Sequence, residues 1–267
     1  MRILILGGKG FLGRHMQEQA EARGYSVSSL DIADEKPFDV NGITPKDIDG
    51  FDHVYHFAAL VGTDRGFEES VAVLETNTIG TLKVLEAARV AQVLMTFVGL
   101  NNTWLNPYSI SKNAAMQLCS MYAENFGLSI HRAITYNVFG PYQPWQGIKR
   151  LIPQTMVNLI KSSPITLYGD GLQTVDLVYV VDVVNALLDN RASGIFHYGS
   201  GVARAVKDVV ALCAEALSVP CPNILFQQKR LGEPEKSISL SPSAMELQTP
   251  IFESLQATAS WYKKSIP

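Results

Sequence analysis

The sequence has little net charge and no long apolar run near its start. Its 22 Lys and Arg residues nearly balance 25 Asp and Glu residues, which gives a formal net charge of −3. This balance supplies no basic field of the kind that attracts nucleic acid, so we expect no nucleic-acid partner. The apolar run of residues 3–6 ends at Gly7 and Gly8, so it is far too short for the apolar region of a secretory signal or for a membrane span. The sequence therefore predicts a cytoplasmic protein without a membrane partner.

Cysteine is scarce. Cys119, Cys213 and Cys221 are an odd number and lack the spacing of a metal site, so no metal site is predicted. They fit a reducing compartment, where we expect them to be buried as small apolar side chains. The chain is nevertheless well supplied with core-forming residues. Of its 267 residues 47% are hydrophobic and 18% charged, which is enough for a full globular core.

Apolar, β-branched runs alternate with helical periodicity along the chain. We expect strands at 2–6, 26–30, 52–57, 93–98, 129–133 and 194–198, and helices at about 10–23, 69–90, 107–125 and 180–190. This order predicts an α/β fold with a doubly wound, Rossmann-type parallel sheet. Segments rich in Pro and Gly, 139–147 and 199 onward, indicate a smaller C-terminal substrate-binding lobe. The expected Rossmann domain comprises 1–137 and 177–200, and the lobe comprises 138–176 and 201–267.

A glycine motif follows the first predicted strand. Gly7, Gly10 and Gly13 have the spacing G-x-x-G-x-x-G, and the helix that follows offers free N–H groups to a pyrophosphate. Asp31 ends the second strand, where a carboxylate can bind the adenine ribose and repel a 2′-phosphate. Asp34 could share this role, and Asp31 could instead be a cap or turn residue. The pattern predicts NAD as the cofactor rather than NADP.

Tyr108 and Lys112 lie four residues apart at the start of a predicted helix. Both side chains therefore project from one face and can meet the same ligand. A neighbouring ammonium lowers the pKa of a tyrosine, which suits acid–base chemistry. This spacing is also common on amphipathic surface helices. Together with the nucleotide motif it indicates a catalytic pair.

These motifs resemble those of the extended short-chain dehydrogenase/reductase family, in its branch of NAD-dependent nucleotide-sugar epimerases and dehydratases. Similar segments run through nearly the whole chain: Asp39-Val40, His56-Phe57-Ala58-Ala59, Asn77-Thr78-Ile79-Gly80-Thr81, 137–141, 167–171, 178–182 and Trp261-Tyr262. The resemblance implies a cofactor site made of Gly7, Gly10, Phe11, Leu12, Gly13, Asp31, Asp39, Val40, Phe57, Ala58, Ala59, Asn77, Tyr108 and Lys112.

The resemblance also implies a reaction on a nucleotide sugar. Tyr108 would remove a proton from a sugar hydroxyl while hydride passes to NAD, and Lys112 would hold the nicotinamide ribose. Return of hydride to the opposite face gives an epimer, whereas other outcomes make the protein a ketoreductase or a dehydrogenase. The candidate substrate-binding residues are Asn137, Lys149, Arg150, Tyr168 and Arg230, although long cationic side chains are often only solvated. The resemblance further implies a homodimer paired through helices 69–90 and 107–125.

The chain departs from the family where relatives carry a catalytic Ser or Thr. Residues 98–108 read VGLNNTWLNPY, so Asn101 or Asn102 falls at the position of that hydroxyl, and Thr103 is the nearest hydroxyl in sequence. The loop before Tyr108 is sharply shortened. An asparagine amide can still donate a hydrogen bond to a developing oxyanion. We therefore keep both Asn101 and Thr103 as catalytic candidates.

Other positions narrow the reaction. Thr96 falls inside a predicted strand, so we expect a core residue. Relatives that are dehydratases carry an Asp-Glu pair after the Thr, but Trp104-Leu105 stand here, which disfavours a 4,6-dehydratase. Val175 replaces an arginine that reaches the nucleotide diphosphate in relatives, and His197 replaces an asparagine and is expected to be packed or at the surface. These departures leave open a catalytically weakened NAD-binding sensor protein.

Overall fold

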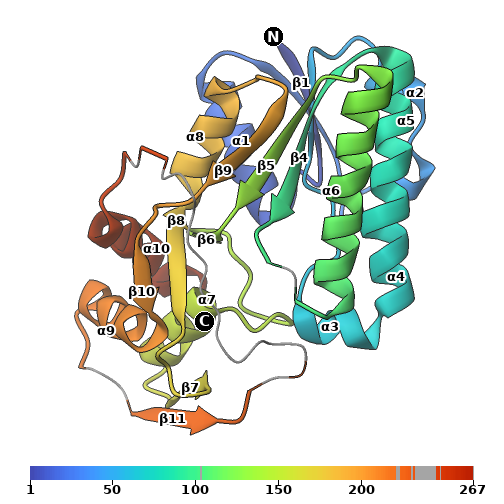
Figure 1. Ribbon diagram of the computed structural model, residues 1–267. Coiled ribbons are helices and arrows are strands. Elements are labelled where there is room, and N and C mark those ends of the chain that lie inside the picture. The colour runs from blue at the N-terminus through green and yellow to red at the C-terminus, as the bar shows by residue number, and fades with distance from the viewer. Residues whose placement is uncertain (103, 221–222, 230, 232–244, 247, 267) are drawn as a thin grey trace. The chain divides into compact units, whose positions relative to one another are not determined.

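The structure is a computed structural model that describes residues 1–102, 104–220, 223–229, 231, 245–246 and 248–266. The chain folds into two compact units. Unit 1 comprises Met1–Thr135 and Val184–Phe196, and unit 2 comprises Tyr136–Val183 and His197–Pro267 (Figure 1). In the described part of the chain, no helix combines the length and apolar character needed to cross a membrane.

Unit 1 is built on a six-stranded sheet in the order β2-β1-β3-β4-β5-β9. The strands are β1 (Arg2–Leu6), β2 (Ser26–Leu30), β3 (His53–His56), β4 (Leu94–Leu100), β5 (Ile130–Thr135) and β9 (Gly194–Tyr198). Strands β1 to β5 pair in parallel. The helical elements are α1 (Phe11–Ala22), η1 (Val40–Gly42), α2 (Pro45–Ile48), α3 (Thr63–Glu68), α4 (Ser70–Leu74), η2 (Glu75–Gly80), α5 (Thr81–Ala91), α6 (Pro107–Phe126) and, from residue 184 on, α8 (Val180–Asp189). The predicted Rossmann-type α/β fold is confirmed.

The central strand β1 shows why this sequence forms a sheet covered on both faces. Ile3, Leu4, Ile5 and Leu6 are all essentially buried, although successive side chains of a strand point to opposite faces. Burial on both faces accounts for an unbroken apolar run where a half-exposed strand would alternate. Each such side chain contributes about 2 kcal/mol through removal from water.

The neighbouring strands carry two polar residues into this core. Thr96 on β4 is fully buried, as expected, and its Oγ1 lies 2.7 Å from Nε2 of His53 on β3. Burial lowers the pKa of His53 to about 3, and the charges of His131 and Arg191 act in the same direction. His53 is therefore neutral in the folded protein, and Thr96 is structural.

The helical stretch predicted as one helix over 69–90 is divided in the structure. It consists of α4, a π-helical turn η2 over Glu75–Gly80, and α5, which begins at Thr81. The side chain of Thr81 donates a hydrogen bond from Oγ1 to the carbonyl of Asn77 at 2.7 Å. This bond supports the π-helical turn, in which Asn77 is buried. Turns of this kind inside helices occur frequently at functional sites.

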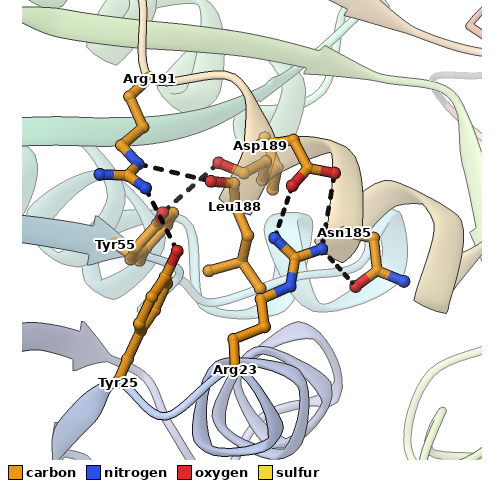
Figure 2. Close-up of polar contacts among 8 residues, drawn as sticks. Arg23, Tyr25, Tyr55, Asn185, Leu188, Asp189 and Arg191 are labelled. Atoms are coloured by element: carbon orange, nitrogen blue, oxygen red, sulfur yellow. Dashed lines mark hydrogen bonds and ion pairs between the residues drawn. The ribbon is translucent and has the colours of Figure 1, made fainter. Parts of the chain in front are cut away.

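The segment Val184–Phe196 is fastened to the beginning of the chain by polar contacts (Figure 2). The guanidinium of Arg23 donates to Oδ1 of Asp189 at 2.6 Å and to Oδ1 of Asn185 at 3.1 Å. The guanidinium of Arg191 donates to the hydroxyl of Tyr25 at 3.2 Å. These contacts join the connection between α1 and β2 to the end of α8 and the residues just after it.

Unit 2 contains two small sheets and a helical core. Strands β10 (Ala203–Ala205), β8 (Thr174–Tyr179) and β6 (Asn137–Phe139) form one sheet, and β11 (Ile224–Gln227) pairs with β7 (Ile165–Tyr168) in the other. Helices α7 (Leu151–Ile160), α9 (Val206–Leu217) and α10 (Ile251–Ser265) supply most of the core. Residues 136–137 and 177–183 lie in unit 2, although they were predicted to belong to the Rossmann domain. Asn137 and Leu177 pair with each other where β6 lies beside β8. Residues 197–200 also lie in unit 2.

The cysteines that the structure describes are buried free thiols. Cys119 lies in the core of unit 1 and Cys213 in the core of unit 2. Burial raises the pKa of each thiol to about 12. Both therefore pack as small apolar side chains, as expected, while Cys221 lies outside the described residues.

Candidate functional site

The turn between β1 and α1 requires glycine at its first and third motif positions. Gly7 has φ +89°, and a Cβ atom there would lie 2.7 Å from the backbone nitrogen of Ala58. A Cβ atom on Gly13 would lie 2.2 Å from the carbonyl oxygen of Gly7. A side chain at Gly7 would collide with the segment after β3, and one at Gly13 would push α1 away from the glycine turn.

The start of α1 has the properties of an anion site. Its N-cap is Gly10, which has no side chain that could occupy the N–H groups of the first turn. The first turn also contains no acidic residue. The N–H groups of Phe11, Leu12 and Gly13 belong to the first turn, where a helix has no internal acceptors for them. These donors and the partial positive charge of the helix fit a pyrophosphate. The residues present therefore suit a dinucleotide.

Asp31 follows β2 and joins the glycine turn to the next loop. Its Oδ2 accepts a hydrogen bond from the backbone N–H of Lys9 at 2.8 Å, and its Oδ1 accepts one from Ala33 at 2.9 Å. Each carboxylate oxygen has a second lone pair, so both can still accept hydrogen bonds from ribose hydroxyls. Asp34 accepts from the backbone N–H of Asp31 at 2.7 Å and pairs with the Lys9 ammonium at 3.0 Å.

Asp39 and Val40, which were predicted to bind the cofactor, lie in different environments. Asp39 is exposed, and its Oδ1 accepts hydrogen bonds from the backbone and side-chain nitrogens of Asn41 at 2.8 and 3.0 Å. Val40 is buried in the core of unit 1. In this structure Asp39 caps the short helix η1, and Val40 anchors it.

The segment after β3 is held close to β1. The backbone N–H groups of Phe57 and Ala58 both donate to the carbonyl of Leu6 at 2.8 Å. Phe57, Ala58 and Ala59 remain partly exposed at the carboxyl end of the sheet. This is the edge at which ligands bind in doubly wound folds.

Asn77 uses its amide inside the protein. It is essentially buried, its Oδ1 accepts from the backbone N–H of Leu60 at 2.8 Å, and its Nδ2 donates to the carbonyl of Leu60 at 2.8 Å and to Oγ of Ser111 at 3.0 Å. Both amide hydrogens are thus occupied. Asn77 positions the segment after β3 against α6.

Helix α6 begins just before the predicted catalytic pair. Asn106 caps it by accepting a hydrogen bond from the backbone N–H of Ser109 at 2.9 Å, and Pro107 occupies the first helical position, which suits its fixed φ. Tyr108 is therefore in the first turn and is partly exposed. Lys112 follows one turn later on the same face.

The ammonium of Lys112 is in an unusual environment for a lysine. Only 7% of the residue is exposed, and Nζ lies 4.1 Å from the centre of the Phe97 ring on β4. Burial lowers its pKa from the ordinary 10.5 to about 8. Within the described residues this ammonium has no hydrogen bond or ion pair to an oxygen. A buried ammonium without an oxygen partner is suited to stabilising an anion that binds next to it.

The short connection between β4 and α6 contains Asn101 and Asn102, one of which aligns with the catalytic Ser or Thr of the similar family. β4 ends at Leu100, and the half-buried Asn101 follows it directly. The carbonyl of Asn102 accepts a hydrogen bond from Nδ2 of Asn113 at 2.9 Å, and its Oδ1 accepts from the backbone N–H of Trp104 at 3.3 Å. Asn102 therefore fastens the connection to α6. Thr103 lies outside the described residues.

The described substrate candidates all lie in unit 2. Asn137 on β6 donates from Nδ2 to the carbonyl of Asp176 at 3.4 Å, and Tyr168 is the last residue of β7. Lys149 is exposed, and Arg150 is the partly exposed N-cap of α7. Arg230 lies outside the described residues.

One cation of unit 2, Arg204, was not predicted from the sequence as a site residue. Arg204 on β10 lies directly opposite Val175 on β8 in an antiparallel pair, so the two side chains share one face of the sheet. Arg204 is partly exposed. No sequence signal identifies this pairing, because the two strands are distant along the chain. His197, expected to be packed or at the surface, is partly buried with Nδ1 3.2 Å from the hydroxyl of Tyr136.

Comparison with known families matches residues 3–190 to the model described as the NAD dependent epimerase/dehydratase family. Among curated proteins, the UDP-glucose 4-epimerase of Mycolicibacterium smegmatis is 25% identical over 98% of this chain and 99% of its own length. The UDP-N-acetyl-alpha-D-glucosaminuronate decarboxylase of Bacillus cytotoxicus is 26% identical over 78% of each chain.

Among solved structures, the UDP-glucose 4-epimerase of Thermus thermophilus, a complex with NAD, superposes with a TM-score of 0.87. It is 26% identical, and the match covers 100% of both chains. The similarity therefore extends over both units of the chain.

Proposed function

Because this chain belongs to the NAD-dependent epimerase/dehydratase family, we propose that it is an NAD-dependent epimerase that acts on a nucleotide sugar through a transient keto sugar. The observation that carries the proposal is the placement of Tyr108 and Lys112 on adjacent turns of α6, in the same unit as the glycine turn and Asp31. Full-length similarity to UDP-glucose 4-epimerases supports a nucleotide sugar as the substrate.

Unit 1 supplies the cofactor-binding groups. The amides at the start of α1 bind the pyrophosphate, and the carboxylate of Asp31 accepts hydrogen bonds from the adenine ribose. Asp39, Val40 and the segment Phe57–Ala59 complete the cofactor side, with Asn77 positioning that segment. Bound NAD supplies a reversible hydride acceptor for a sugar carbon.

Tyr108 acts as the acid–base residue. Its phenolate removes a proton from the reacting sugar hydroxyl, and the tyrosine hydroxyl formed in this way returns the proton when the keto sugar is reduced. The positive charge of Lys112 favours the phenolate form of Tyr108, and its ammonium binds the ribose hydroxyls on the nicotinamide side. Asn101, or Thr103 two positions later in the sequence, donates a hydrogen bond to the reacting oxygen.

Unit 2 supplies the groups for the sugar nucleotide. We assign its diphosphate to Asn137, Lys149, Arg150 and Arg230, with Tyr168 as a further substrate contact. Arg204 adds a guanidinium beside Val175, and guanidinium groups bind phosphate oxygens in pairs. This assignment gives the diphosphate several cationic donors without an arginine at position 175.

We further infer a cytoplasmic homodimer that pairs through the helices α4, α5 and α6. Helices α4 and α5 follow one another in line, and α6 lies beside both of them at one side of unit 1 (Figure 1). Together with the turn η2 between α4 and α5, they expose several large apolar side chains: Val71, Leu74, Ile79, Ile110 and Met121. Mass measurement by light scattering is expected to give a dimer for the wild type and a monomer for Val71→Glu. Leu225→Glu, an exposed apolar position of unit 2, should stay dimeric.

The proposed reaction is tested by proton NMR of UDP-, GDP-, dTDP- and CDP-sugars incubated with the protein and a trace of NAD. Conversion of one sugar into its epimer, without accumulation of NADH, is the expected result. An oxidised sugar formed in step with NADH would replace the epimerase by a dehydrogenase. NAD binding without any conversion would contradict the epimerase and favour a ketoreductase or a sensor.

Tyr108→Phe is the matched variant for this experiment, since it removes only the hydroxyl. We expect epimerisation to fall by about 10²- to 10⁴-fold while NADH binding is retained. Unchanged conversion would remove Tyr108 from its proposed role.

A further inference from the structure

The glycine turn carries a lysine that is paired with a second acid near Asp31. The Lys9 ammonium lies 3.0 Å from Oδ1 of Asp34 and donates a hydrogen bond to the carbonyl of Ala33 at 2.8 Å. Oδ2 of Asp34 accepts from the backbone N–H of Asp31. The backbone of Lys9 in turn donates to Asp31. These contacts form a closed ring between the glycine turn and the end of β2.

The ring decides which charges a ligand meets beside Asp31. The cluster holds two carboxylates, of which Asp34 pairs with the one ammonium, so it is net negative. The Lys9 hydrogen bond is the main cause that holds the pKa of Asp34 below its usual range, so Asp34 keeps its charge to a lower pH than an ordinary aspartate. A 2′-phosphate on the adenine ribose would be repelled by this cluster, although an ammonium is the kind of group that binds phosphate.

Lys9 has the freedom to reach another partner. Its side chain is 44% exposed, whereas that of Asp34 is 26% exposed. A lysine ammonium is a compact charge on a flexible stem, so it can turn toward a nearby phosphate once its carboxylate partner is gone.

We propose that Asp34 is a cofactor-specificity residue: by holding Lys9 in an ion pair, it prevents the glycine-turn cation from binding a 2′-phosphate, and so excludes NADP together with Asp31. Asp34 thus acts on the cofactor through Lys9, while Asp31 contacts the ribose. The inference rests on the proposed function only in taking NAD as the cofactor.

The test is a fluorescence titration of the purified protein with NADH and with NADPH, which reads binding without turnover. Asp34→Asn is the main variant, because the asparagine oxygen can still accept from the N–H of Asp31 and maintain the turn. We expect its NADPH affinity to rise about fivefold, in the range of an exposed ion pair, with NADH affinity changed less than twofold. The gain should shrink at high salt.

Two controls isolate the pair. Lys9→Met in the Asp34→Asn background should abolish the NADPH gain. Glu35→Gln makes the same charge change at the next position, where the side chain is exposed, and should alter neither affinity.

Unchanged NADPH affinity in Asp34→Asn would overturn the proposal, and so would a gain that survives Lys9→Met. In either case NADH binding by the wild type leaves the proposed NAD enzyme intact. A wild type that binds neither nucleotide would overturn both.

Discussion

Asn77 donates a hydrogen bond from Nδ2 to Oγ of Ser111 across 3.0 Å, joining the π-helical turn to α6. The same contact belongs to a longer buried path. Ser111 donates from Oγ to the carbonyl of Tyr108 at 2.8 Å, and Thr81 donates to the carbonyl of Asn77. Nε2 of His56 at the end of β3 lies 3.0 Å from Oγ1 of Thr81. Hydrogen bonds thus connect the end of a central strand to the turn that carries Tyr108.

Asn77→Ala should destabilise the protein and loosen this turn. It leaves the backbone groups of Leu60 and the hydroxyl of Ser111 without their buried partner, which costs about 2 to 4 kcal/mol of unfolding free energy in total. Urea unfolding measures that loss, and NADH titration should show weaker binding. Glu75→Ala changes an exposed residue of the same turn and should have little effect. Equal stability of Asn77→Ala and wild type would contradict the positioning role.

Lys112→Met should make the protein more stable but inactive. The pKa of Lys112 falls from 10.5 to about 8 on folding, because burial disfavours the charged form. Below about pH 8 the buried lysine is nevertheless charged, and this charge lowers the stability of the folded protein. Stability of the wild type therefore rises as pH increases from about 8 to 10.5, as the buried ammonium is deprotonated. The uncharged methionine side chain of the variant avoids this cost.

We expect Lys112→Met to gain roughly 2 kcal/mol at pH 7, and less at pH 10. Urea unfolding at both pH values checks this, together with loss of epimerisation. A variant less stable than wild type at pH 7 would show that the ammonium stabilises the fold.

His53 should contribute to acid sensitivity. Its pKa falls from 6.5 to about 3 on folding, so the unfolded chain binds more protons between these values. This contribution to stability is complete above about pH 6.5 and is lost as pH falls toward 3, by at most about 1.4 kcal/mol per pH unit. Urea unfolding from pH 7 to 4.5 should show a smaller slope in His53→Gln than in wild type. Identical slopes would assign the acid sensitivity to other groups.

Arg204→Met should weaken substrate binding without impairing the chemical step. If its guanidinium binds the diphosphate, KM for the nucleotide sugar rises by about tenfold while kcat changes little. Steady-state kinetics on the sugar identified by NMR separates these parameters. Lys207→Met, an exposed charge on the adjoining helix α9, is the control and should leave KM unchanged. A fall in kcat alone would remove Arg204 from phosphate binding.

The fold of unit 1 was predictable because its signals are local. Strands β1, β2 and β9 have the predicted bounds. The glycine turn and Asp31 were found because their spacing reflects backbone geometry. The interruption of the helix after residue 74 was not predicted, since helical periodicity continues through the π-helical turn and only tertiary hydrogen bonds of Asn77 reveal it.

Contacts between residues that are far apart along the chain could not be predicted from the sequence pattern. Asp34 suggested a share in ribose binding, yet the structure pairs it with Lys9. Arg204 gave no signal, because its position opposite Val175 depends on the register of two strands far apart along the chain. The roles of Thr103 and Arg230 remain predictions.

The contacts that join residues 184–196 to unit 1 limit how this chain can be divided. A fragment ending at Thr135 would keep the glycine turn and Tyr108, but it would lack β9, which lies beside β5 in the sheet. The ring of His131 would lose its stacking partner Phe196, 4.6 Å away. β5 would become an open edge able to pair with other chains, which promotes aggregation. An isolated cofactor-binding unit therefore requires the distant segment to be grafted back.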